Sequence, residues 1–208
     1  MHRLPEAALN AGILGPEYWA RIACDFVRSI GIPVQLTEEN AALAGGFLPK
    51  IQVSAGGLIV DVTQVFPGDI LHEAGHLAVI PAVFRPQASG HLEAVHAAMS
   101  SHLQENIEGL MSCPEDPVCR AIMQADDPES TAWQYAAAQA IGLPDEWLFP
   151  EDAFDGEAAN TLAALRARQY LGINGLQAAG WTVLRRNPRR DVPEYPKLAF
   201  WLHGGPAT

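Results

Sequence analysis

The stretch PGDILHEAGHLAVI, residues 67–80, contains the most informative pattern in this chain of 208 residues. Its apolar residues recur at spacings of three and four, which predicts a helix. Pro67 suits the first turn of that helix, and Pro81 ends it. Because apolar residues cover most of its circumference, we expect this helix to be buried. They are Ile70, Leu71, Ala74, Leu77, Ala78, Val79 and Ile80.

Two histidines and a glutamate lie within this helix, in the order His72-Glu73-Ala74-Gly75-His76. At 100° per residue the two imidazoles are about 40° apart, so both can reach one metal ion while the opposite face packs. Glu73 lies between the apolar stripe and the histidine pair. It can therefore stand beside a metal-bound water as a general base without being a ligand. The pattern predicts His72 and His76 as metal ligands and Glu73 as the catalytic base.

The segments around this helix predict an α+β fold. Residues 49–66 resemble two strands joined by a turn at Ala55-Gly56-Gly57, because β-branched residues alternate on both sides of that turn. We expect a small antiparallel hairpin sheet, followed by the active-site helix and a mainly helical remainder. The other helices are expected at about residues 15–30, 91–111, 128–141 and 155–171.

Charge divides the chain unevenly. Residues 1–160 carry 6 Lys and Arg against 22 Asp and Glu, whereas residues 161–208 carry 7 against 2. No linker-like stretch separates these parts, so we expect one domain over residues 1–208, with a basic segment from about 161 packed on the acidic body. Trp181, Phe200 and Trp201 are expected to be buried there, although a contact surface for an acidic partner is an alternative.

The net charge of −11 argues against non-specific binding of nucleic acid. No apolar run approaches the roughly 20 residues that a membrane span needs. The amino-terminal residues lack a secretory apolar region, and Cys24, Cys113 and Cys119 are too few for a disulfide framework. We therefore expect a soluble cytoplasmic protein that binds neither membrane nor nucleic acid directly.

A catalytic zinc site needs a third protein ligand and an open position for water. The metzincin spacing HExxHxxGxxH is excluded, because Val79 and Ala82 occupy its glycine and third histidine positions. Glu129 is our first choice, since it opens the helix at 128–141. Alanines 132, 136 and 140 are expected to let that helix approach the histidine helix closely. His91, His96 and His102 are alternatives.

The chain resembles the gluzincin peptidases, and among them the ImmA/IrrE type of bacterial metallopeptidase. The resemblance rests on LHEAGHLAV (71–79) and on ESTAWQYA (129–136), with GLP and DEWLFP following at 142–150. It covers about residues 66–150. It implies a zincin-like fold in a protein of bacterial or phage origin, with Zn²⁺ held by His72, His76 and Glu129. No helix-turn-helix segment accompanies these motifs.

These observations predict a zinc-dependent peptidase that acts on a protein or peptide, including a regulatory protein, with Glu73 as base. Two alternatives are a catalytically silent regulatory or protein-binding module of the same fold and a metal hydrolase for a non-peptide substrate. Asp69, one turn before His72, is a candidate for orienting an imidazole. The oxyanion donor is left open among Tyr135, Tyr170, Tyr195 and His203.

Overall fold

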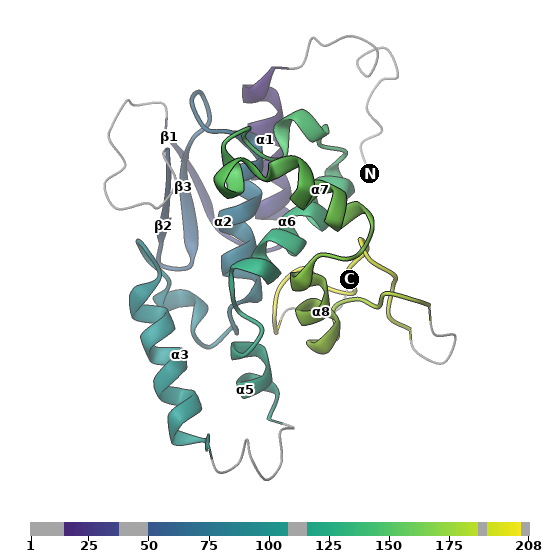
Figure 1. The fold of residues 1–208 in the computed structure, drawn as a ribbon. Coiled ribbons are helices and arrows are strands. Elements are labelled where there is room, and N and C mark those ends of the chain that lie inside the picture. The colour runs from purple at the N-terminus through teal and green to yellow at the C-terminus, as the bar shows by residue number, and fades with distance from the viewer. Residues whose placement is uncertain (1–14, 38–49, 108–115, 187–190, 205–208) are drawn as a thin grey trace.

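A computed structural model describes residues 15–37, 50–107, 116–186 and 191–204 of the chain (Figure 1). Its sheet has three strands, β1 (Val34–Thr37), β2 (Ile51–Ser54) and β3 (Gly57–Asp61), in the order β1-β3-β2. Strands β2 and β3 form the predicted antiparallel hairpin. The purely antiparallel prediction was wrong, because β1 pairs with β3 in parallel. Strand β1 is short and only partly buried, so it lacks the alternation that marks the hairpin strands.

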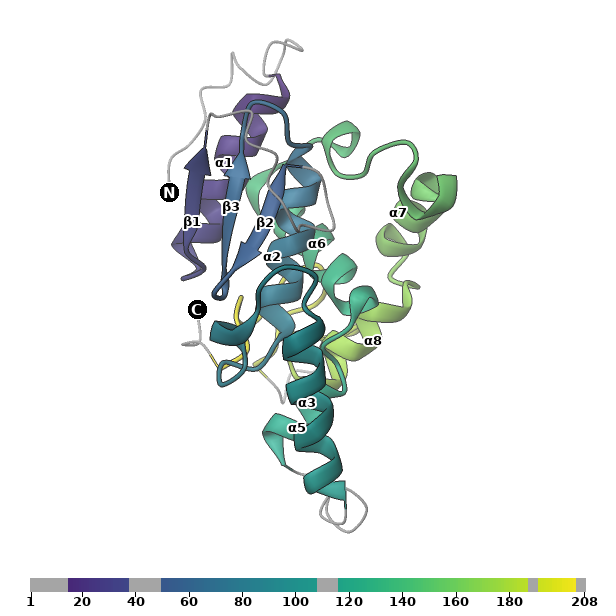
Figure 2. The same cartoon turned by 90° about the vertical axis from the view of Figure 1, so that its left-hand side faces the viewer.

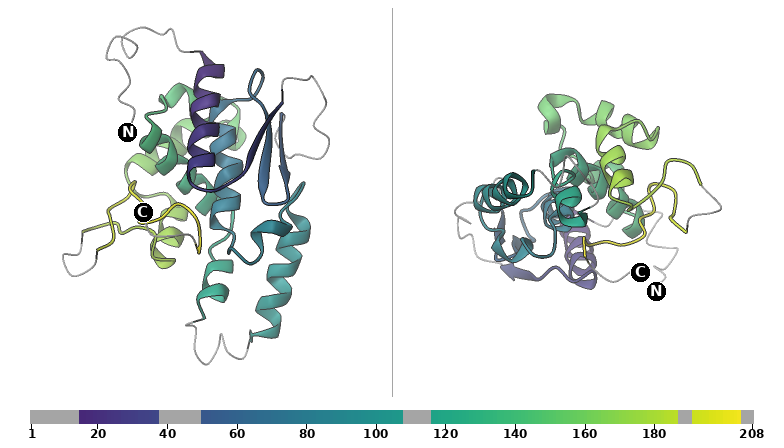
Figure 3. Two further views of the ribbon diagram at one scale, coloured as in Figure 1. Left: turned by 180° about the vertical axis from the view of Figure 1, so that it is seen from behind. Right: turned by 90° about the horizontal axis from the view of Figure 1, so that it is seen from below.

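Helices α1 (Pro16–Ser29) and α2 (Pro67–Val79) lie together on one face of this sheet (Figures 2 and 3). Helix α2 is the predicted histidine helix, and it ends just before Pro81 as expected. Its apolar side chains are buried, which confirms the prediction of a core helix. The histidines are therefore carried by one of the most firmly packed elements of the protein.

Helix α6 (Asp127–Ile141) packs along α2 and ends at Gly142, whose φ of +70° suits glycine. The close approach is made at Gly75, where a Cβ atom would lie 2.7 Å from the carbonyl oxygen of Ser130. The prediction that Ala132, Ala136 and Ala140 make this approach was wrong, because they lie on the opposite side of α6 from Ser130 and Gln134, which meet α2. Ala136 and Ala140 instead border the segment 191–201. The glycine inside the HEAGH pattern is what brings the two helices together.

Helix α3 (Glu93–Glu105) is shorter than the predicted 91–111 helix, whose residues 108–111 lie outside the described residues. It follows the short 3₁₀ helix η1 (Arg85–Gln87). Helix α5 (Pro117–Ile122) was not predicted. Helices α3 and α5 contact each other and project from the rest of the molecule (Figures 1 and 2).

The helix predicted at 155–171 is confirmed only over residues 158–166, because Arg168, with a φ of +58°, interrupts it before a second helix begins at Leu171. The two helices are α7 (Ala158–Arg166) and α8 (Leu171–Ala178), after the 3₁₀ helices η2 (Asp145–Trp147) and η3 (Ala153–Gly156). Helix α8 packs against α6.

The expected burial of the aromatic residues near the carboxyl end is confirmed for Trp181, whereas Phe200 and Trp201 are only partly buried against the core. Trp181 is buried, with its ring 4.7 Å from that of Phe200, and the Trp133 indole nitrogen donates to the Trp201 carbonyl at 3.1 Å. In the described part of the chain, no helix has both the length and the apolar character needed to cross a membrane.

Candidate metal centre

Three side-chain atoms from α2 and α6 meet at one point. The Nε2 atoms of His72 and His76 are 3.2 Å apart, and Asp127 Oδ1 lies 3.3 Å from the first and 3.5 Å from the second. In a tetrahedral zinc site with bonds of about 2.0–2.1 Å, ligand atoms are separated by about 3.3 Å. The three atoms therefore already have the spacing of three corners of a zinc tetrahedron.

The side-chain amide of Gln134 determines which nitrogen of His72 carries the proton. Its Nε2 donates to the carbonyl oxygens of Gly68 and Leu148, each at 3.0 Å. The amide oxygen is thereby turned toward His72 Nδ1 at 3.2 Å, where it accepts the ring N–H. We therefore assign the neutral His72 ring a lone pair at Nε2, the atom that faces Asp127.

Ser130 has the same effect on His76. Its hydroxyl donates to the backbone oxygen of Asp126 at 3.1 Å and lies 3.0 Å from His76 Nδ1. Because the hydroxyl proton is already used, the serine oxygen accepts the ring N–H. The neutral His76 ring thus also has its lone pair at Nε2. Such outer hydrogen bonds are the usual way in which proteins orient histidine ligands.

Three atoms with lone pairs therefore face one another, and this arrangement needs a positive charge between them. A proton on one imidazole satisfies only part of the cluster, whereas a metal ion satisfies all three atoms at once. Burial lowers the pKa of His72, but the hydrogen bond and the charge of Asp127 outweigh it and raise this pKa overall. When the Nε2 atoms carry protons instead of a metal, hydrogen bonds from His72 and His76 hold the pKa of Asp127 well below its usual range.

Glu73 is only 6% exposed and lies beside this cluster on α2. Its charge acts on both His72 and Asp69. Burial raises the pKa of Asp69 to about 6. Asp69 does not take the orienting role expected for it, because the Nδ1 atoms of the two rings face Gln134 and Ser130.

The structure places the predicted third ligand, Glu129, away from the two imidazoles. Residues 127 and 129 are about 200° apart around α6, so they face opposite sides of the helix. The Glu129 carboxylate lies against α8, where a Cβ atom on Gly175 would be 1.9 Å from its oxygen. Burial raises the pKa of Glu129 to about 7. The carboxylate grouped with His72 and His76 belongs to Asp127.

The alternative histidines do not join this group either, because His91 and His96 are exposed and His102 belongs to a different cluster. Among the suggested oxyanion donors, Tyr195 is committed elsewhere, since its hydroxyl donates to the Ala132 carbonyl at 2.9 Å. Tyr170 lies near enough to Asp127 and Glu129 for their charges to add to the effect of burial, which raises its pKa.

Sequence analysis missed Asp127, Ser130 and Gln134, although a pattern marks them. They occupy positions i, i+3 and i+7, which share one face of a helix. Most of the other buried residues of α6 are apolar, so this polar row is distinct. Only the packing of α6 on α2 shows that the row faces the two histidines.

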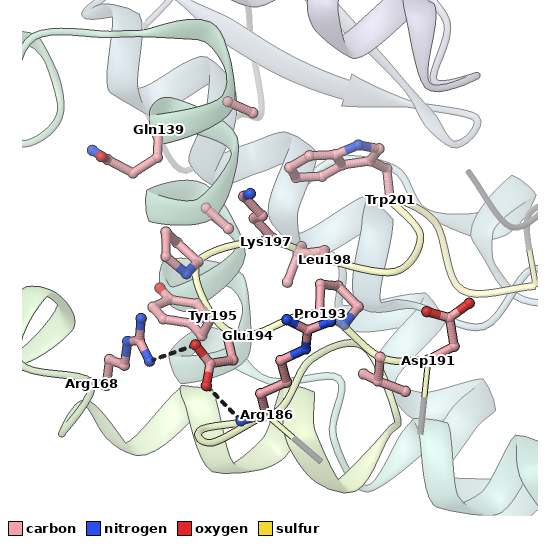
Figure 4. A pocket seen from close by; sticks show the side chains of 14 residues that line it. Gln139, Arg168, Arg186, Asp191, Pro193, Glu194, Tyr195, Lys197, Leu198 and Trp201 are labelled. Carbon is pink, nitrogen blue, oxygen red and sulfur yellow. Dashed lines mark hydrogen bonds and ion pairs between the residues drawn. The ribbon is translucent and has the colours of Figure 1, made fainter. Parts of the chain in front are cut away.

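A hollow of about 1120 Å³ lies beside another part of α6, against the segment 191–201 (Figure 4). Glu194 lies there between Arg168 and Arg186, with Oε2 3.7 Å from the Arg168 guanidinium and Oε1 accepting the Arg186 backbone N–H at 2.5 Å. Neither the histidine pair nor Asp127 lines this hollow, so it is separate from the candidate metal centre.

Comparisons of the chain with protein-family models, with curated proteins and with solved structures found no significant match.

Proposed function

We propose that this protein is a zinc-dependent peptidase with His72, His76 and Asp127 as metal ligands and Glu73 as general base. The observation that carries the proposal is the convergence of three lone-pair atoms at 3.2–3.5 Å, with both rings oriented by further hydrogen bonds. The proposal replaces Glu129, which the family resemblance implies, by Asp127. The aspartate is two residues earlier on the face of α6 that meets α2.

The donor set suits zinc better than calcium or magnesium. Two imidazoles and one carboxylate form a common catalytic zinc set, whereas Ca²⁺ and Mg²⁺ prefer oxygen ligands. Zinc bound here would supply a Lewis acid and a bound water with a pKa near 7.

The chain's own residues would do the remaining work. Glu73 is positioned beside the histidines to accept the proton of the attacking water and to pass it to the leaving amine. Gln134 and Ser130 keep both rings in the tautomer that binds metal. The Asp127 side chain is 57% exposed, which leaves this side of the cluster open to water and substrate. Tyr170 is our candidate for donating a hydrogen bond to the oxyanion.

A peptide is the substrate that the fold favours. Strand β2 is an edge strand among the described strands, and α2 packs directly against it. The Val53 carbonyl at this edge already accepts the Gly90 N–H at 2.9 Å, so an extended peptide would add as a further strand along the Ile51 end. This edge supports a peptide rather than a small-molecule substrate, and the gluzincin resemblance points the same way.

The test combines metal analysis with substitutions of His76 and Glu73 and one control variant. We expect zinc in protein purified without chelator, with one equivalent lost in His76→Ala. Glu73→Gln should keep this zinc and slow cleavage of a mixed peptide library by about 10²–10⁴-fold, the usual contribution of a general base. Glu93→Gln, on exposed α3 surface, is the matched control.

Two results would contradict the proposal. If His76→Ala contains as much zinc as the unmodified protein, both as purified and after zinc is added, the cluster is not a metal site. If zinc binds but no peptide is cleaved by the unmodified protein, the catalytically silent module becomes the better interpretation.

A further inference from the structure

A second group of potential metal ligands lies on the projecting pair of helices, outside the candidate metal centre. His102 is in the last turn of α3, Asp116 is the N-cap residue of α5, and Cys119 is in the first turn of α5. One ligand atom from each, a ring nitrogen, a carboxylate oxygen and a sulfur, lies within 4.8 Å of the other two.

We propose that His102, Asp116 and Cys119 bind a second metal ion of the zinc type, which clips α5 to α3. Imidazole, carboxylate and thiolate are three ligands that zinc takes in proteins, and sulfur disfavours Ca²⁺ and Mg²⁺. The proposal is independent of the catalytic one, because the two groups share no residue.

The local contacts leave the three ligand atoms usable. The ring of Phe84 lies edge-on to that of His102, with centroids 5.6 Å apart, and limits how the imidazole turns. One carboxylate oxygen of Asp116 accepts the Cys119 backbone N–H at 2.7 Å, and the carboxylate also hydrogen-bonds with the Val118 N–H and the Cys119 thiol. A metal would replace the contact between the thiol and the carboxylate. The capping of α5 accounts for the hydrogen bond between Asp116 and Cys119. It does not account for the position of the His102 ring beside them.

Binding requires a small contraction and the loss of one proton. Ligand atoms around tetrahedral zinc are about 3.3–3.6 Å apart, given bonds of about 2.3 Å to sulfur and 2.0–2.2 Å to nitrogen and oxygen. The group therefore needs to close by at most about 1.5 Å, which the half-buried His102 and exposed Asp116 side chains allow. The Cys119 S–H bond breaks as the sulfur–metal bond forms, and the proton leaves to solvent.

The region of α3 and α5 has little stabilisation of its own, and a metal link would add to it. Helix α5 has 6 residues, far fewer than the roughly 12–15 at which isolated helices become even marginally stable. Helix α3 buries only Val95 and Met99. A metal ion that binds the assembled site but not the unfolded chain would stabilise the folded arrangement and hold α5 in place.

Cobalt provides a test that sees this site alone, because a thiolate bound to Co²⁺ gives a charge-transfer absorption that a site built from two histidines and an aspartate lacks. We expect full-length protein, stripped of metal and titrated with Co²⁺, to show this absorption and to bind two equivalents. Cys119→Ser should lose the absorption and one equivalent. His102→Ala should weaken the same binding event by at least tenfold. Far-ultraviolet circular dichroism verifies that each variant is folded.

Two controls test the assignment. Cys24→Ser should leave the absorption unchanged, since Cys24 is buried in the main core. His76→Ala should lose the other equivalent but keep the absorption. The proposal is overturned if no thiolate absorption appears, or if it persists in Cys119→Ser.

Discussion

Two carboxylates in the first turn of α6 have opposite environments although only one residue separates them. Asp127 is on the side that meets α2, where hydrogen bonds from the two imidazoles, when these are protonated at Nε2, hold its pKa low. Glu129 is on the side that meets α8, where burial raises its pKa to about 7. The side chain of Asp127 is 57% exposed, whereas Glu129 is only 9% exposed.

The comparison shows that proximity in sequence is a poor guide to a metal ligand. A sequence motif that requires only an acidic residue in this turn is satisfied by either Asp127 or Glu129. Helical geometry allows only one of them to reach the histidines, because residues two apart face nearly opposite directions. The partner helix on each side then decides whether the carboxylate is a ligand or a buried acid.

The largest effect should come from removing the carboxylate on the α2 side. Asp127→Ala should lower zinc affinity by more than about 100-fold, since loss of an outer hydrogen bond alone typically costs 10–100-fold. Glu129→Ala should leave zinc affinity within about twofold of the original protein, as expected for a residue outside the ligand set. Competition with a chromogenic chelator measures both. The reverse order of effects would restore Glu129 as third ligand and imply that α6 turns when metal binds.

A smaller effect is expected from the polar row that orients the rings. Gln134→Met keeps the approximate volume but removes the acceptor for His72 Nδ1, so zinc affinity should fall by about 10–100-fold. Gln139→Met changes an exposed residue of the same helix and should have no effect on zinc. Equal affinity of the two variants would mean that Gln134 serves only the packing of α2, through Gly68 and Leu148.

A substitution on the α8 side should have the smallest effect on zinc affinity. It should instead lower the stability of the fold. In Gly175→Ala the new Cβ would lie 1.9 Å from the Glu129 carboxylate oxygen, so the buried side chain must move. We expect a loss of about 1–3 kcal/mol in the free energy of unfolding, the usual cost of overpacking. Urea denaturation measures this loss, and zinc affinity should stay unchanged.

The double variant Glu129→Ala with Gly175→Ala sharpens this prediction. Truncation of Glu129 creates the space that the new methyl group needs, so the two changes should cost less together than their sum. Additive costs would show that the strain at position 175 comes from another neighbour.

Much of the fold follows from local patterns. The hairpin is marked by alternating residues around Ala55 and Gly56, and the histidine helix by its apolar spacing and its flanking prolines. Strand β1 and helix α5 escaped prediction because they have 4 and 6 residues, and each depends on contacts with distant segments. The break at Arg168 was also missed, since no glycine or proline marks it.

By itself the sequence determined the HEAGH pattern, the burial of the helix that carries it, and the pairing of two imidazoles with a neighbouring Glu73. These features depend on spacing within one helix, which local geometry controls. Only the tertiary structure decided that Asp127, rather than Glu129, accompanies the histidines. That choice depends on which face of α6 meets α2 at Gly75, and a rotation between two packed helices is a property of their contact.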